Sequence, residues 1–237
     1  MIHKAKKSLG QNFLKSVPAL NKIVEAGEVY KEDIILEIGP GKGALTEKLL
    51  EKVYPPNSSG GRGCVIAIEA DRDLFEFLKT KFEKEINDKK LVLINEDILS
   101  DKNFLLAGVS QADEPRGSAP RARGDSDPIK EEFLLRYKII ANIPYNITGA
   151  ILKKFLTEKN QPERMVLMVQ NEVAKRITAR DGKESILSVS VKAYGDPKIV
   201  MKVPSRYFSP APKVDSAIIS IKNISRWGCI QNGFRYP

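Results

Sequence analysis

Short apolar runs alternate along the chain with segments whose apolar residues recur at helical spacing. The apolar runs, each predicted to be a buried strand, cover residues 34–40, 64–70, 90–98, 138–144 and 164–170. The segments with helical spacing cover residues 43–53, 72–86 and 149–158. Apolar strands that alternate with amphipathic helices are typical of βαβ units. The pattern therefore predicts an α/β fold in which helices cover both faces of a mostly parallel sheet.

Two further apolar runs, residues 198–204 and 214–223, follow each other without a helix between them. A Pro-rich connection joins them, which predicts an antiparallel pair at the edge of the sheet. A Rossmann-like sheet that is mostly parallel, with one antiparallel strand late in the chain, is the usual order of class I S-adenosylmethionine-dependent methyltransferases. On this pattern alone the assignment is an analogy of fold.

Residues 107–128 interrupt the alternation. This segment is poor in large apolar side chains and rich in Pro, Gly, Ser, Arg and Asp. We therefore expect a flexible insertion that is too polar to pack. Arg116, Arg121 and Arg123 offer contacts to RNA, but acidic residues in the same segment largely offset their charge.

Composition narrows the chemistry. His3 is the single histidine, and the two cysteines, Cys64 and Cys229, lack metal-ligand spacing, so we expect neither a metal site nor a Ser-His triad. No apolar run reaches the length of about 18 residues that a membrane span needs, and the N-terminus lacks the apolar region of a secretory signal. We therefore expect a cytoplasmic protein.

Charge points to a class of partner. The 237 residues include 39 Lys and Arg against 30 Asp and Glu, a net charge of +9, and the pI is near 9.4. This excess favours a polyanion such as nucleic acid, although a solvated basic surface explains it equally well.

The first predicted strand runs into a glycine-rich turn, residues 39–43 (GPGKG). Glycines at that place let the backbone approach a ligand closely. The spacing is not the G-x-G-x-x-G of dinucleotide binders, and a tight turn explains it as well. The next two strands end in Glu69 and Asp97, whose carboxylates can accept from ribose hydroxyls and an adenine amino group. Each acid alone fits a solvated loop end, but the three strand ends together describe a nucleoside pocket.

The fourth predicted strand ends in Asn142-Ile143-Pro144-Tyr145. Pro144 cannot continue the hydrogen bonding of a strand, and it disfavours the helical conformation at Ile143. An amide, a rigid turn and an aromatic ring thus follow one another at the end of this strand.

Four motifs in register resemble one known family. They are residues 8–14 (SLGQNFL), 37–41 (EIGPG), 142–146 (NIPYN) and 208–216 (FSPAPKVDS). Over residues 4–223 the chain resembles the small-subunit ribosomal RNA adenine N6,N6-dimethyltransferases. Relatives of this family include large-subunit rRNA adenine methylases and mitochondrial transcription factors. The GQNFL and PKVDSA motifs are closer to the small-subunit branch.

The resemblance implies S-adenosylmethionine as the cofactor and a set of residues that would hold it. Asn12 and Leu14 would lie over its methionine and ribose, and Asn142 would lie between it and the target base. Gly39 and Gly41 would contact the cofactor through their backbone, and Glu69 would hold its ribose. Asp97 and Ile98 would hold its adenine.

The implied catalytic residues are Asn142, Pro144, Tyr145 and Phe208. The Asn142 side-chain oxygen and a backbone carbonyl of the turn can accept both hydrogens of the adenine N6 amino group, which polarises and aims that nitrogen. Pro144 would stiffen the turn, and Tyr145 and Phe208 would stack on the two faces of an extruded base. For both rings, core packing is the alternative.

Basic residues offer a track for RNA, which phosphate contacts would position. They are Lys153, Lys154, Arg176, Arg206 and Lys213, together with Lys4, Lys6, Lys7, Lys15 and Arg180. The implied partner is small-subunit rRNA or a pre-small ribosomal subunit, bound by a monomer.

The family continues into a small helical C-terminal domain, whereas residues 226–237 form a tail without a helical pattern. We therefore expect one catalytic domain over residues 1–225 and no family C-terminal domain. A non-catalytic RNA-binding assembly factor remains an alternative, as does a large-subunit methylase. A nicotinamide-dependent oxidoreductase is disfavoured by the G-x-G-x-G spacing.

Overall fold

The computed structural model describes residue 6 and residues 10–53, 63–100, 136–179 and 182–225. The expected insertion at 107–128 and the tail at 226–237 lie outside the described residues, as do His3 and Cys229. Predicted RNA contacts that also lie outside them are Lys4, Lys7, Arg116, Arg121, Arg123 and Arg180.

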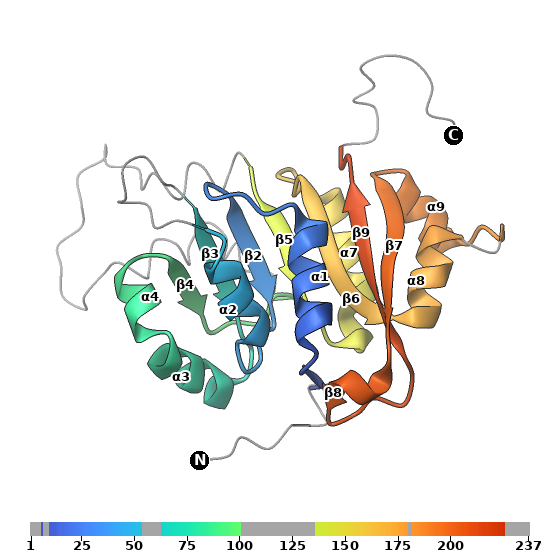
Figure 1. Ribbon diagram of the computed structural model, residues 1–237. Helices are drawn as coiled ribbons and strands as arrows, with labels where there is room; N and C mark the ends of the chain where they lie inside the picture. Colours follow the sequence, from blue (N-terminus) through green and yellow to red (C-terminus); the bar gives the residue numbers. More distant parts are fainter. Residues whose placement is uncertain (1–5, 7–9, 54–62, 101–135, 180–181, 226–237) are drawn as a thin grey trace.

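A seven-stranded sheet forms the middle layer of the described structure, with the strand order β4-β3-β2-β5-β6-β9-β7 (Figure 1). Its strands are β2 (Ile34–Ile38), β3 (Cys64–Ile68), β4 (Leu91–Ile94), β5 (Lys138–Ala141), β6 (Arg164–Gln170), β7 (Asp196–Val203) and β9 (Ser216–Lys222). Neighbours from β4 to β6 are parallel, and β9 runs antiparallel to both β6 and β7. The predicted parallel sheet with a late antiparallel strand is therefore confirmed.

Helices cover both faces of this sheet. They are α1 (Val17–Gly27), α2 (Ala44–Leu50), α3 (Arg72–Lys81), α4 (Glu83–Asn87), α7 (Thr148–Thr157), α8 (Asn171–Thr178) and α9 (Ile186–Lys192). Alternate strand residues point to opposite faces, so they supply two apolar clusters. Along β2, Ile35 packs with residues of α1, α2 and α3, whereas Leu36 packs with residues of α7, α8 and α9.

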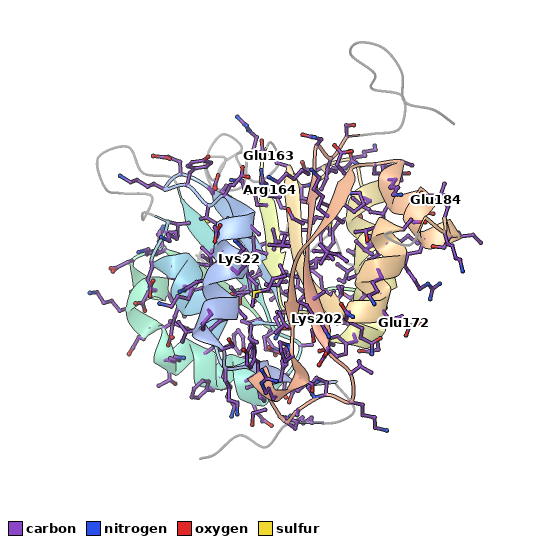
Figure 2. The ribbon with its side chains drawn as sticks, turned by 45° about the vertical axis from the view of Figure 1, so that its right-hand side comes forward. Lys22, Glu163, Arg164, Glu172, Glu184 and Lys202 are labelled. Atoms are coloured by element: carbon purple, nitrogen blue, oxygen red, sulfur yellow. The ribbon has the colours of Figure 1, made fainter. Side chains whose placement is uncertain are left out.

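The carboxyl ends of the parallel strands share one edge of the sheet, the lower edge in Figure 1. In Figure 2, Arg164 at the start of β6 lies at the upper end and Lys202 near the end of β7 lies at the lower end. The chain moves from β2 outward to β3 and β4 and then returns to β5 on the other side of β2. In open α/β sheets, ligands bind beyond the strand ends at such a reversal.

Two features of the helices differ from the sequence pattern. The helix predicted over 72–86 is divided at Phe82, whose φ of −112° and ψ of 27° are not helical. Helices α1, α8 and α9 are absent from the elements that the pattern predicts. The α9 sequence, ILSVSVK, alternates apolar and polar residues as a strand does, but a capping box of Ser185 and Ser188 starts a helix there.

A second small sheet joins the first and last of the four motifs. Strand β1 (Phe13–Leu14) pairs antiparallel with β8 (Phe208–Ser209), and the Lys15 N–H donates to the Tyr207 carbonyl at 2.8 Å. Strands of two residues leave no periodic signal, so this pairing was not predictable from the pattern. It fixes the N-terminal motif beside the main sheet.

Candidate active site

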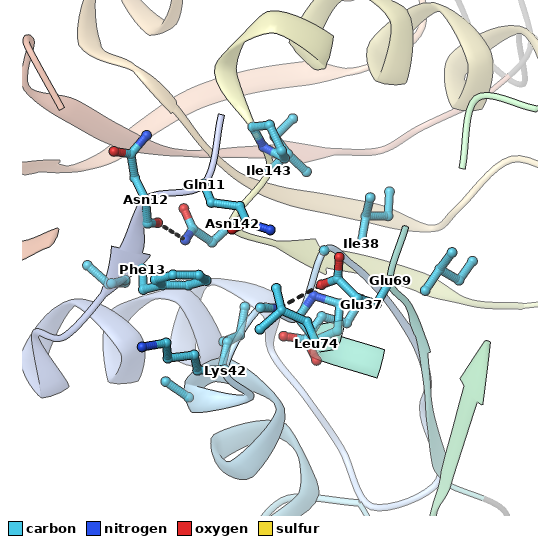
Figure 3. Close-up of a pocket in the computed structure, with 18 of the residues that line it drawn as sticks. Gln11, Asn12, Phe13, Glu37, Ile38, Lys42, Glu69, Leu74, Asn142 and Ile143 are labelled. Atoms are coloured by element: carbon cyan, nitrogen blue, oxygen red, sulfur yellow. Dashed lines mark hydrogen bonds between the residues drawn. The ribbon is translucent and has the colours of Figure 1, made fainter. Parts of the chain in front are cut away.

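A cavity of about 690 Å³ lies at the carboxyl edge of the sheet, where the strand order reverses. Its wall comes from five parts of the chain. One is residues 10–15, which with residue 6 are here called the N-terminal segment. The others are the glycine-rich turn after β2, the segments after β3 and β4, and the turn after β5. Figure 3 shows these parts converging on one space. Its volume is within the range of about 300–1,000 Å³ that is usual for ligand pockets.

The glycine-rich turn requires glycine for its conformation and for space. Gly39, Gly41 and Gly43 have φ values of 65°, 61° and 79°, which side chains rarely adopt. A Cβ on Gly41 would lie 3.0 Å from the Phe13 ring, and one on Gly43 would lie 2.5 Å from the Phe82 ring. The predicted close turn at the end of the first strand is therefore observed, and both Gly39 and Gly41 line the cavity.

Glu69 is held at the cavity wall by backbone amides. Its Oε2 accepts from the Gly41 N–H at 3.1 Å, and its Oε1 accepts from the Asp71 N–H at 3.0 Å. Burial raises the pKa of Glu69, and these hydrogen bonds oppose the rise. Each carboxylate oxygen retains a lone pair, so the fixed carboxylate can accept further hydrogen bonds from a ligand.

Glu37 is a cavity residue to which the sequence analysis gave no role. Its side chain on β2 is 1% exposed, and its Oε2 has no hydrogen-bond partner within the described part of the chain. Burial raises the pKa of Glu37 to about 8, with Thr46 opposing the rise and the Glu69 carboxylate adding to it. The signal was available, because a glutamate inside an otherwise apolar strand is costly to bury without a functional or structural partner.

Asp97 and Ile98 both line the cavity on the segment after β4. The predicted strand over 90–98 ends earlier, at Ile94, so Asp97 lies in a turn and not at the strand end. Its Oδ1 accepts from the Leu99 N–H at 2.9 Å. Asp97 is exposed, whereas Ile98 is 5% exposed and belongs to the core.

Asn142 follows the last residue of β5 and lines the cavity opposite Glu69 (Figure 3). Its Nδ2 donates to the Asn12 backbone carbonyl at 3.3 Å. This contact assigns the amide orientation, because the carbonyl can only accept. The Asn142 Oδ1 is therefore the side-chain atom that remains to accept a hydrogen bond from a ligand.

Tyr145 lies in the short helix η2 (Tyr145–Ile147) and lines the cavity beside Pro144. Its hydroxyl and the Ser216 Oγ are 2.5 Å apart, and burial raises the pKa of the phenol. Ser216 belongs to the motif at 208–216, so two motifs distant in sequence meet at this hydroxyl. The contact fixes the ring while its cavity side stays available.

The N-terminal motif forms the remaining wall. Asn12 and Leu14 line the cavity, and Phe13 between them covers Gly41. The Lys42 Nζ lies 4.9 Å from the centroid of the Phe13 ring, a favourable cation–π distance. All the residues predicted to hold the cofactor thus line one cavity.

Phe208 does not line this cavity. Its side chain is 2% exposed and packs in the apolar cluster beneath α1 and α2. Leu14 is its partner in the β1–β8 pairing. The structure therefore brings Asn142, Pro144 and Tyr145 together but leaves Phe208 behind the N-terminal segment.

The predicted RNA contacts of the C-terminal half lie outside the cavity. Lys153, Arg176, Arg206 and Lys213 are exposed, and the Lys154 Nζ donates to the Ser100 carbonyl at 3.4 Å. In the N-terminal segment, Lys15 lines the cavity. Lys6 forms ion pairs with the carboxylates of Asp71 and Asp73.

The described residues offer neither a metal centre nor a membrane span. No group of three or more His, Cys, Asp or Glu in this part of the chain is placed to hold a metal ion. None of the described helices is long and apolar enough to cross a membrane.

Solved structures define the class of protein. The 23S rRNA methyltransferase ErmE is similar with a TM-score of 0.67 and 25% identity, over 93% of this chain and 73% of that chain. A dimethyladenosine transferase from Plasmodium falciparum is similar with a TM-score of 0.64 and 27% identity, over 89% of this chain and 62% of that chain. The chain has the fold of the class I S-adenosylmethionine-dependent methyltransferases.

The family follows from sequence. Residues 2–226 match the family described as "Ribosomal RNA adenine dimethylase", and the chain belongs to this family. It is 41% identical to the ribosomal RNA small subunit methyltransferase A of Dehalococcoides mccartyi (strain CBDB1), over 92% of this chain and 62% of that protein. It is 37% identical to the protein of the same name from Fusobacterium nucleatum, over 94% of this chain and 70% of that protein. The chain thus spans less than two thirds of the length of the first of these relatives.

Proposed function

We propose that this chain transfers methyl groups from S-adenosylmethionine to N6 of adenosines in small-subunit rRNA, giving N6,N6-dimethyladenosine. The observation that carries the proposal is the hydrogen bond from the Asn142 Nδ2 to the Asn12 carbonyl at 3.3 Å, which leaves Oδ1 as the open acceptor of a side chain that lines the cavity. The names of its relatives support the small subunit over the large one. In this proposal residues 1–225 form the catalytic domain of a cytoplasmic monomer.

The cavity wall offers partners for the nucleoside part of S-adenosylmethionine. Glu69 would accept the ribose hydroxyls, and Asp97 with Ile98 would hold the adenine. The backbone of Gly39 and Gly41 leaves room for close approach.

Glu37, which lies near Glu69, offers a site for a cation. The Glu37 Oε2, which has no partner among the described residues, would accept from the ammonium group. That bond would supply the partner that a buried carboxylate needs. Asn12 and Leu14 would cover the methionine and ribose.

When bound, S-adenosylmethionine supplies an electrophilic methyl group, so the protein needs no covalent nucleophile. Adenine N6 is a poor nucleophile because its lone pair is delocalised into the ring. The Asn142 Oδ1 and a carbonyl of Ile143 or Pro144 would accept its two hydrogens, which directs the lone pair toward the methyl group. Such fixed acceptors stabilise the charge that develops on the nitrogen, and each is worth about 10²–10³ in rate. The proton can then leave to water.

The target base must leave its stack to reach this turn. Tyr145 would stack on one face, in the position set by Ser216. Contact of Phe208 with the other face would require the β1–β8 pairing to rearrange, because Phe208 is buried behind it. Lys153, Lys154, Arg176, Arg206 and Lys213 would bind phosphates and set the register of the RNA.

The test is transfer of labelled methyl groups to unmethylated small subunits, with naked rRNA and large subunits as parallel substrates. We expect N6,N6-dimethyladenosine in small-subunit rRNA alone. Label on large subunits would favour the large-subunit alternative. Cofactor binding without transfer to any substrate would contradict the enzyme proposal and favour a binding factor.

A further inference from the structure

Asp71 is a buried carboxylate with more partners than its place at a helix start requires. It is the N-cap of α3 and is 2% exposed. Its Oδ1 accepts from the Lys6 Nζ at 2.6 Å and from the Asp73 N–H at 3.0 Å. Its Oδ2 accepts from the Gln11 Nε2 at 2.7 Å. An N-cap needs only the bond to the helix amide, so the bonds from Lys6 and Gln11 are not required to start α3.

Both extra donors belong to the N-terminal segment, and they also contact each other. The Lys6 N–H donates to the Gln11 Oε1 at 2.8 Å. Lys6 and Gln11 therefore reach Asp71 as one unit. Burial would raise the pKa of Asp71, but the bonds from Lys6, Gln11 and the Asp73 amide outweigh it and lower the pKa. The carboxylate is thus charged at neutral pH and retains the Lys6 ammonium.

The same residue also contacts the cavity from its other side. Its backbone N–H donates to the Glu69 Oε1, the carboxylate proposed to hold the ribose. The segment that it anchors continues from Gln11 into Asn12, whose carbonyl holds the Asn142 amide. In Figure 3, Gln11 and Asn12 lie beside Asn142, and Glu69 lies on the other side of the pocket.

We propose that Asp71 is a positioning residue that fastens the N-terminal segment across the cofactor cavity, and that this anchor links the cofactor carboxylate Glu69 to the catalytic amide Asn142. The inference rests on the proposed function for what the cavity holds. With the anchor intact, the cofactor binds beneath a closed segment and Asn142 keeps its orientation. Replacing Lys6 leaves the buried Asp71 carboxylate without its cation, and replacing Asp71 removes the ion pair that holds the segment.

Asp73 provides a matched control within the same cluster. Its Oδ2 lies 2.7 Å from the same Lys6 Nζ, but its side chain is 73% exposed, against 0% for Asp71. Exposed pairs contribute little because water and salt screen them. The Gln11 amide donates to Asp71, so loss of the Asp73 charge leaves that part of the anchor in place.

The experiment compares Asp71→Asn with Asp73→Asn. Asparagine is a good N-cap, so α3 keeps its start while the ion pair to Lys6 is lost. A hydrogen bond to a charged group is worth enough to change an equilibrium by about tenfold or more. We expect Asp71→Asn to raise the Kd for S-adenosylmethionine about tenfold by isothermal titration calorimetry, and Asp73→Asn to change it less than about twofold.

Two readouts separate anchoring from general stability. In the ligand-free protein, hydrogen exchange of the amides at 10–15 should speed up in Asp71→Asn and not in Asp73→Asn. Lys6→Met leaves the helix cap untouched and should raise the Kd similarly, and the double variant should be no weaker than either single one. Such non-additivity is expected only of two groups that act through one contact.

The outcomes are distinct. A folded Asp71→Asn variant with wild-type affinity and wild-type exchange at 10–15 would overturn this inference, as would equal losses in Asp71→Asn and Asp73→Asn. If Asp71→Asn fails to fold, Lys6→Met decides by the same two measurements. If the wild-type chain binds no S-adenosylmethionine, the proposed function fails, while the exchange measurement still tests the anchor.

Discussion

At the scale of single residues, the site depends on polar groups whose hydrogen bonds are only partly satisfied within the described structure. The Asn142 Nδ2 donates to the Asn12 carbonyl, and its Oδ1 remains an open acceptor on a side chain that lines the cavity. Glu37 has a buried oxygen without a partner in the described part of the chain. Native proteins satisfy nearly all buried polar groups, so the Glu37 oxygen in the cavity wall is a candidate contact for a ligand.

Asn142→Ala should separate binding from chemistry. The substitution removes the acceptor for N6 but leaves Glu69 and Asp97 in place. We expect the Kd for S-adenosylmethionine to change little and kcat to fall by about 10²–10³. Single-turnover methyl transfer checks the rate and calorimetry checks the affinity. A variant that transfers at the wild-type rate would show that Asn142 does not polarise N6.

Glu37→Gln should change how stability depends on pH. Glu37 has a pKa of about 8 in the folded protein against an ordinary value of 4.5. Between these values the folded protein holds a proton that the unfolded chain has lost. The proton on Glu37 therefore stabilises the wild-type fold fully below pH 4.5, and this stabilisation is lost as the pH rises through about 8.

Denaturant unfolding at several pH values measures the free energy of unfolding of the wild-type chain and of Glu37→Gln. We expect the stability of the variant relative to wild type to increase across that window, because the variant has no proton to lose at this position. Its affinity for S-adenosylmethionine should fall. Parallel pH curves for the two proteins would contradict the buried, proton-holding state of Glu37.

At the scale of elements, the amino ends of the strands are joined by a polar cluster far from the cavity. Lys138 on β5 is 6% exposed, and its Nζ donates to Asp33 at 2.6 Å and to the Glu28 carbonyl at 2.7 Å. The ring of Tyr30 lies 4.9 Å from the same ammonium. A charge inside the four-residue strand KIIA is tolerated because these groups replace water.

Asp33→Asn should therefore destabilise the fold. It leaves the buried Lys138 ammonium without its carboxylate, which costs about 3–5 kcal/mol. Denaturant unfolding measures the loss. Adding Lys138→Met to Asp33→Asn should recover much of it, because no unpaired charge then remains. A loss below about 1 kcal/mol in the single variant would mean that the pair behaves as a surface contact.

At the scale of the whole molecule, charge and architecture have separate roles. The sheet positions the cavity, whereas the net charge of +9 favours binding to a polyanion. The exposed residues Lys153, Arg176, Arg206 and Lys213 lie outside the cavity. They can therefore bind phosphates without taking part in the chemistry.

Neutralising these residues should change the salt dependence of RNA binding. Each phosphate contact adds about 0.7–0.9 to the slope of log K against log salt concentration. We expect Arg206→Gln and Lys213→Gln each to reduce that slope by about one contact, with the Kd for S-adenosylmethionine unchanged. Titrations of rRNA fragments at several salt concentrations give the slope. An unchanged slope would mean that the RNA phosphates do not contact Arg206 or Lys213.

Much of this fold was predictable because its signals are local. The apolar runs marked every strand of the large sheet, and β6 has the bounds that the pattern predicts. The helices α8 and α9 were missed because they are short and because α9 has the alternation of a strand. Helix α1 was also missed, although its buried residues recur at helical spacing. The division of the helix at Phe82 was missed because it depends on the packing of that ring against Gly43.

The parallel sheet, the glycine turn and the four motifs could be predicted from the sequence, since periodicity and turn chemistry act over a few neighbouring residues. The burial of Phe208 behind Leu14, the Lys6–Asp71 ion pair and the bond from Asn142 to the Asn12 carbonyl became visible in the folded structure alone. The same holds for Glu37, whose pKa depends on burial among distant elements. These contacts join residues far apart in the chain, and no local pattern specifies the partner that folding brings to each.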